Sequence, residues 1–74
     1  MINEVAILEI INKTLDKSLD LATTPLDQPL ESLGIDSLDF YTLLVELEAH
    51  AGRKVPDEVL PKLQTIHALA DFFK

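Results

Sequence analysis

Apolar residues that recur three and four positions apart limit most strongly what this chain can fold into. They recur in this way in three segments, from residue 3 to about Lys17, from Asp36 to near Gly52, and from Thr65 to the end of the chain. An α-helix has 3.6 residues per turn, so this spacing gathers the apolar side chains on one face. The alternation typical of strands does not occur. The sequence therefore predicts an all-α fold.

Polar residues stand where these helices should begin. Asn3, Asp36 and Thr65 each precede an apolar periodic segment, and side chains of these types accept hydrogen bonds from the unpaired N–H groups of a first helical turn. Asp39, three residues after Asp36, resembles the second member of a capping box. Gly52 is predicted to end the second helix, because glycine readily takes the left-handed conformation found after helix ends.

Two segments between the helices should be ordered without being long helices. Pro56 and Pro61 bracket only four residues, so we expect at most one short helical turn there. Residues 18 to 35 are too rich in apolar side chains for a solvated linker, and we expect these side chains to pin the loop to the core. They are Leu19, Leu21, Leu26, Leu30, Leu33 and Ile35.

Length and charge narrow the possible functions. A chain of 74 residues has room for one core, so residues 1–74 should form a single domain, expected to be a monomer. The net charge of −7 makes nucleic acid and anionic membrane surfaces poor partners and favours proteins with basic patches. Cysteine is absent, which excludes disulfides and thiolate metal sites. The N-terminal residues do not resemble a secretory signal, and no stretch could cross a bilayer, so we expect a cytoplasmic protein without membrane insertion.

The second helix has a second apolar feature besides its buried stripe. The predicted stripe is Phe40, Leu43, Leu44, Leu47 and Ala51. Leu38 and Val45 lie almost opposite it, and because they are seven residues apart they share one outward face. Their neighbours on or beside that face are Tyr41, Thr42, Glu46, Glu48 and Ala49. Single exposed apolar residues are common, but an apolar pair flanked by carboxylates favours a docking surface for another protein.

Ser37 lies in the first turn of this helix, where free N–H groups and the helix dipole would favour a phosphate ester. A hydrolase is poorly supported, because a serine nucleophile needs a base within reach. His50 falls near the far end of the same helix and His67 on another helix, so both are interpreted as surface or helix-end residues. Capping explains Asp36 and Asp39 more simply than metal binding. We therefore expect no metal site and no catalytic residue.

Residues 33–39, Leu-Gly-Ile-Asp-Ser-Leu-Asp, are similar to the Leu-Gly-x-Asp-Ser-Leu motif of acyl carrier proteins. The motif falls between a long loop and a helix, as it does in that family. The similarity extends over the whole chain, through Val-Pro-Asp-Glu at residues 55–58 to the last helix. The resemblance implies an acyl-carrier type of four-helix bundle with a long first loop and a short third helix.

The resemblance also implies a function. A phosphopantetheinyl transferase would move a 4′-phosphopantetheine arm from coenzyme A to Ser37, and the thiol of the arm would hold acyl groups as thioesters. These would be presented to acyl-loading and acyl-transferring enzymes with basic docking patches. Asp36 would position the segment and help the transferase dock. The residues that match the family's recognition helix are Leu38, Asp39, Val45 and Glu46, and Tyr41 and Glu48 lie beside them.

The resemblance leaves the pathway open. Phe40, Tyr41 and Thr42 stand where fatty-acid carriers usually have more acid, and Arg53 and Lys54 add positive charge. Fatty-acid, polyketide and related biosynthesis therefore all remain candidates. Two alternatives outside acyl transfer are a helical protein-interaction module, in which Ser37 would only be part of a helix start, and a stand-alone peptidyl or aminoacyl carrier.

Overall fold

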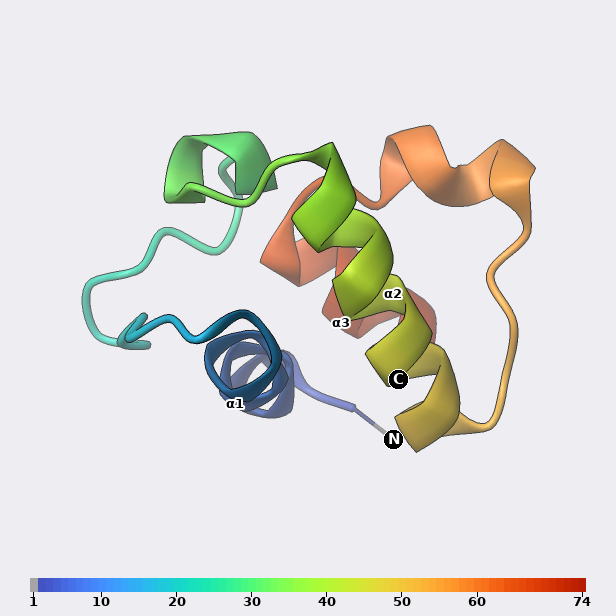
Figure 1. Ribbon diagram of the computed structural model, residues 1–74, viewed down its shortest axis with the longest axis horizontal. Coiled ribbons are helices and arrows are strands. Elements are labelled where there is room, and N and C mark those ends of the chain that lie inside the picture. Colours follow the sequence, from blue (N-terminus) through green and yellow to red (C-terminus); the bar gives the residue numbers. More distant parts are fainter. Residues whose placement is uncertain (1) are drawn as a thin grey trace.

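The computed structural model describes residues 2–74, which form three α-helices and two 3₁₀ helices and contain no strand. The elements are α1 (Glu4–Leu15), η1 (Leu30–Leu33), α2 (Ser37–Ala51), η2 (Asp57–Lys62) and α3 (Ile66–Phe73). In Figure 1, α1 is seen end-on, α2 crosses in front of α3, and η1 and η2 lie on either side of the first turn of α2. The all-α bundle with a long first loop and a short third helix is confirmed, and η1 adds a 3₁₀ turn within that loop.

Each α-helix begins at the predicted N-cap. The three side-chain oxygens accept hydrogen bonds of 2.8–2.9 Å, from Ala6 to Asn3, from Asp39 to Asp36 and from Ala68 to Thr65. Gly52 ends α2 with a φ of 68°, as predicted. The end of α1 differs from the expectation of about Lys17, because Asp16 takes a left-handed conformation with a φ of 53° and stops the helix after Leu15.

One core joins the three α-helices. The predicted stripe of α2 is buried except for Ala51, which is partly buried, while Leu38 and Val45 are 76% and 63% exposed. The fully buried side chains of the core come from α1, η1, α2 and α3. They are Ile7, Ile11, Leu30, Leu43, Leu47, Ile66 and Leu69. The rotation of α2 is therefore the one that the apolar spacing predicted.

The long first loop is attached to the core largely as predicted. Leu30 and Ile35 are buried, and Leu19, Leu26 and Leu33 are partly buried. The prediction is wrong for Leu21, which is 44% exposed because it lies in a turn that follows Asp20 at the surface. A further attachment was not predicted. The side-chain amide of Asn12 donates to Leu19 O at 2.8 Å and accepts from Leu19 N at 2.9 Å, so the start of the loop is tied to α1.

The helix between Pro56 and α3 is longer than predicted. It extends over Asp57–Lys62 and includes Pro61, which was expected to end it. Two hydrogen bonds show how proline is accommodated, because Val59 N donates to Pro56 O and Leu63 N donates to Leu60 O, and neither needs an N–H from Pro61. The φ angle that proline fixes also lies within the 3₁₀ range.

Arg53 connects the segment after α2 to the end of α3. Its guanidinium Nη1 donates to Phe72 O at 2.8 Å, and the guanidinium carbon Cζ lies 4.5 Å from the centre of the Phe72 ring. The sequence placed this cation just beyond the C-terminal end of α2, whereas the structure uses it at the C-terminal end of α3. The C-terminal ends of both helices carry negative partial charge, so a cation such as the guanidinium of Arg53 is favoured at either end.

The rotation of α2 leads to a prediction for stability. Leu47→Ala should lower the free energy of unfolding by about 2–5 kcal/mol, because it opens a cavity among fully buried side chains. Val45→Glu is the matched control on the exposed side and should change it by no more than about 0.5 kcal/mol. Urea unfolding followed by circular dichroism measures both. A larger loss for Val45→Glu would mean that α2 is rotated differently.

Candidate functional site

Ser37 is placed at the surface by the residues just before it. Gly34 takes a φ of 83° and its N–H donates to Glu31 O, which ends η1. Ile35 then turns into the core, where it is buried, and its N–H donates to Leu30 O at 3.2 Å. A side chain other than glycine at position 34 would be strained, because it would have to adopt this left-handed backbone. With Gly34 and Ile35 fixed, the next two residues emerge at the start of α2.

Asp36 orders the turn that carries Ser37. Its carboxylate Oδ1 accepts from Asp39 N at 2.8 Å, and its backbone oxygen accepts from Phe40 N at 2.8 Å. Ser37 is the first residue of α2 and its side chain is exposed. The free N–H groups of a first helical turn and the positive end of the helix dipole favour a phosphate group at this place.

A groove of about 360 Å³ lies beside Ser37, between η1, the start of α2 and η2. The groove was not predicted from the sequence, because its walls come from two stretches, residues 30–41 and residues 60–64, that only the fold brings together. Its lining combines buried apolar side chains with carboxylate, hydroxyl, phenol and amide groups. The lining residues are Leu30, Glu31, Ile35, Asp36, Ser37, Phe40, Tyr41, Leu60, Pro61 and Gln64.

The outward side of α2 carries a set of exposed apolar side chains. Leu38, Tyr41 and Val45 are all more than half exposed, and exposed Glu46 lies next to Val45. We call these four residues the docking face. Tyr41 belongs both to this face and to the groove beside Ser37. The face and the groove therefore meet within one helical turn of Ser37.

Glu48 differs from the other carboxylates of α2. It is only partly exposed, and its Oε2 accepts from Val55 N at 2.7 Å. This bond holds the chain where it returns from the end of α2. The carboxylate of Glu48 thus stabilises the fold. We leave Glu48 out of the docking face for this reason, and its part in partner recognition stays a prediction.

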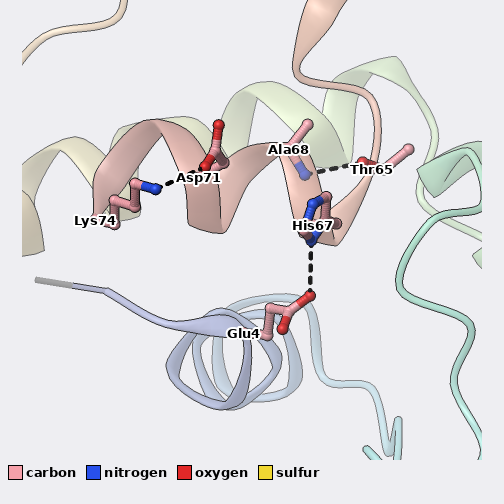
Figure 2. A network of polar contacts seen from close by, with 6 residues as sticks. All are labelled: Glu4, Thr65, His67, Ala68, Asp71 and Lys74. Atoms are coloured by element: carbon pink, nitrogen blue, oxygen red, sulfur yellow. Dashed lines mark hydrogen bonds and ion pairs between the residues drawn. The ribbon is translucent and has the colours of Figure 1, made fainter.

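The two histidines lie apart from Ser37, as the sequence analysis expected. His50 Nε2 is 3.9 Å from Glu46 Oε2 on the second half of α2. His67 Nδ1 is 3.2 Å from Glu4 Oε2, and Figure 2 shows this contact between α3 and the first turn of α1. Both imidazoles therefore pair with carboxylates away from Ser37. In residues 2–74, no helix is long and apolar enough to cross a membrane, and no three potential metal ligands of the types His, Cys, Asp and Glu cluster together.

Comparison with known proteins agrees with the geometry around Ser37. A family model described as a phosphopantetheine attachment site matches residues 5–73. The acyl carrier protein of Borreliella burgdorferi is 37% identical over 65 residues, which cover 88% of this chain and 80% of that relative. This chain belongs to the acyl carrier protein family.

Other carriers show the same relationship. An acyl carrier protein homolog of Mycoplasma genitalium is 39% identical over 61 residues, which cover 82% of this chain and 69% of the relative. The acyl carrier protein of Rickettsia canadensis is 28% identical over 71 residues, or 96% of this chain and 81% of the relative. No solved structure matches the chain significantly.

Members of this family carry acyl groups on a covalently attached 4′-phosphopantetheine arm, and they act as carriers and not as catalysts. The residues around Ser37 fit such a group. An exposed hydroxyl stands at the N-terminus of a helix, where a phosphate is favoured, and a groove with both apolar and polar walls begins beside it. When bound, the arm supplies a thiol that holds the acyl group as a thioester.

The cap at Asp36 gives a prediction about this turn. Asp36→Ala should lower the free energy of unfolding by about 1 kcal/mol, because the N–H of Asp39 loses its acceptor. Asp36→Asn is the matched variant, since asparagine caps as well as aspartate and removes only the charge. Thermal unfolding measures both. Equal losses in the two variants would show that charge matters more here than the cap.

Proposed function

We propose that Ser37 is the residue that carries the phosphopantetheine arm. The observation that carries this proposal is the exposed hydroxyl of Ser37 at the first position of α2, within the Leu-Gly-Ile-Asp-Ser-Leu segment and beside the groove. The other two serines lie in different surroundings. Ser18 is in the loop after α1, and Ser32 Oγ already donates to Pro29 O at 2.6 Å within η1.

The attachment needs little from the carrier itself. The oxygen of Ser37 forms a bond to the phosphorus of coenzyme A that bears pantetheine, the bond to the other phosphate breaks, and adenosine 3′,5′-bisphosphate leaves. The proton of the hydroxyl passes to a base on the transferase. The carrier contributes an exposed oxygen in an ordered turn, held by Asp36 and by the burial of Ile35. Ser37 then acts as an anchor and has no catalytic duty.

The docking face provides the surface on which partner enzymes recognise the carrier. Its apolar centre consists of Leu38, Tyr41 and Val45, and the carboxylates of Asp36, Asp39 and Glu46 lie on the same helix start or face. With a net charge of −7, the protein attracts basic patches over a distance, while the apolar residues give contact area once the two surfaces meet. The transferase and the acyl-transferring enzymes are the partners that fit these properties.

The carried intermediates belong to fatty-acid, polyketide or related biosynthesis in the cytoplasm. The relatives matched are acyl carrier proteins, which favours acyl over aminoacyl cargo. We infer that the protein works as a monomer, because its partners need α2 accessible and one complete core is present in a single chain.

Attachment at Ser37 can be tested directly. Wild-type protein treated with coenzyme A and a promiscuous transferase should gain the mass of one phosphopantetheine, and Ser37→Ala should gain none while keeping its helical circular dichroism, because alanine is a good helix former. Ser32→Ala is the control and should be modified like the wild type. Modification that persists in Ser37→Ala would place the arm on another residue.

Electrostatic attraction at the docking face predicts salt dependence. The kcat/KM of the transferase should fall roughly ten-fold from low to physiological ionic strength, because added salt screens the carboxylates of α2. Val45→Glu should lower kcat/KM at all salt concentrations by placing a charge in the apolar centre. Leu21→Glu, on an exposed apolar residue outside α2, adds the same charge as a control and should have little effect. Flat kinetics across salt would remove electrostatics from the recognition of this carrier.

A further inference from the structure

Tyr41 stands over the groove that begins at Ser37. It lies four residues after Ser37, so one helical turn places both on the same side of α2. It lines the groove and is nevertheless 57% exposed. Its ring centre is 6.0 Å from that of Phe40, with the rings tilted by 60°, and Phe40 is itself buried. The buried neighbour limits where the ring of Tyr41 can move.

Gln64 lies on the lining of the same groove, in the segment between η2 and α3. Its backbone oxygen accepts from Leu30 N at 2.7 Å, and its side-chain Nε2 donates to Leu60 O at 2.8 Å. The first bond ties it to η1 and the second to η2. Because the acceptor is a carbonyl, the donating nitrogen is fixed, and the side-chain oxygen of Gln64, a residue that lines the groove, is left as an acceptor.

Two carboxylates stand among the lining residues of the groove. They belong to Glu31 and to Asp36, which directly precedes Ser37, and an arm attached at Ser37 begins with a negatively charged phosphate. These carboxylates repel the phosphate, whereas the free N–H groups of the first turn of α2 attract it. The remainder of the arm is neutral, so the carboxylates do not attract it. The remaining wall offers the phenol of Tyr41, the amide of Gln64 and the apolar surface of Leu60 and Pro61.

The segment of the arm next to the phosphate has the matching chemistry. It contains two methyl groups, a hydroxyl and amide groups, which need apolar contact together with hydrogen-bond donors and acceptors. We propose that Tyr41 and Gln64 are positioning residues that hold this first segment against Leu60 and Pro61. This inference rests on the proposed attachment at Ser37. It makes the arm a partly docked group, with the thiol end extending beyond the groove.

The composition of the chain provides a direct probe of this docking. Tyr41 is the only tyrosine and there is no tryptophan, so tyrosine fluorescence reports on this one residue. We expect quenching of Tyr41 by neutral acrylamide to fall by about half when the full chain is converted to the pantetheinylated form. A fall of this size corresponds to an arm that is docked, and shields the ring, in about half of the molecules. Ser37→Ala taken through the same treatment should show no change.

Gln64→Ala tests the second positioning residue. It removes both the bond to Leu60 O and the side-chain acceptor, so acrylamide quenching of the loaded variant should return to the value of the form without the arm. Thr42→Ala is the matched control, because Thr42 follows Tyr41 on α2, is exposed and does not line the groove. It should keep the full decrease. Circular dichroism confirms that both variants keep their helices.

The absence of cysteine allows a second measurement that does not depend on tyrosine fluorescence. The thiol of the arm is the only thiol in the loaded protein, so a nitroxide can be attached to it selectively. Tyr41→Phe keeps the ring and removes the hydroxyl, and the ratio of slow to fast nitroxide motion should fall roughly two- to ten-fold, the effect of one hydrogen bond.

The outcomes separate the two proposals. A protein that gains the mass of the arm at Ser37 but shows unchanged Tyr41 quenching and unchanged label motion in Tyr41→Phe would overturn the positioning role and leave the attachment intact. A protein that gains no mass would overturn the attachment at Ser37 and the positioning role with it. The positioning role would be established if acrylamide quenching of Tyr41 falls when the arm is attached, if Gln64→Ala abolishes this fall, and if Thr42→Ala keeps it.

Discussion

The burial of one stripe of α2 fixes the arrangement on which the other features depend. Leu43 and Leu47 are fully buried in the core that α2 shares with the other helices, and this burial sets the rotation of α2 about its axis. Once the rotation is set, Leu38 and Val45 must face outward and Tyr41 must lie at the edge of the groove. A rotation that buried Val45 would expose core leucines, at a cost of about 1.5–3 kcal/mol for each side chain. The docking face is therefore a consequence of core packing.

The groove depends on a different set of interactions, which hold the long loop and η1 against the chain between η2 and α3. Gln64 accepts from Leu30 N, and His67 N donates to Leu26 O, so the long loop is fastened to the start of α3 at two points. His67 also pairs with Glu4, which joins α1 to the same region of α3 (Figure 2). The bond between Leu30 and Gln64 links η1 to the segment after η2, and these two short helices lie on either side of the first turn of α2 (Figure 1). The groove and the exposed Ser37 therefore lie at the same end of the bundle.

Some charged side chains of this protein stabilise the fold, and others remain available for recognition by partners. The carboxylate of Glu48 accepts from Val55 N and Arg53 donates to Phe72 O, so both charges help to place the chain between α2 and η2. Glu46 belongs to the docking face and faces solvent, apart from its 3.9 Å contact with His50. Charges of the first kind are matched by partners within the chain, while charges of the second kind remain available to a basic partner. The net charge of −7 alone could not distinguish the two.

The sequence by itself determined the features that depend on neighbours along the chain. The three N-caps at Asn3, Asp36 and Thr65, the stop at Gly52 and the buried stripe of α2 all follow from helical periodicity and local hydrogen bonding, which act over three or four residues. The motif around Ser37 is also local. Only the structure showed that Pro61 lies inside η2 and that Glu48 accepts from Val55 N, through hydrogen bonds between residues three to seven positions apart. Only the tertiary structure decided that Arg53 binds the end of α3 and that Tyr41 and Gln64 line one groove. These features need residues far apart in the chain to meet, and where they meet is set by how the helices pack.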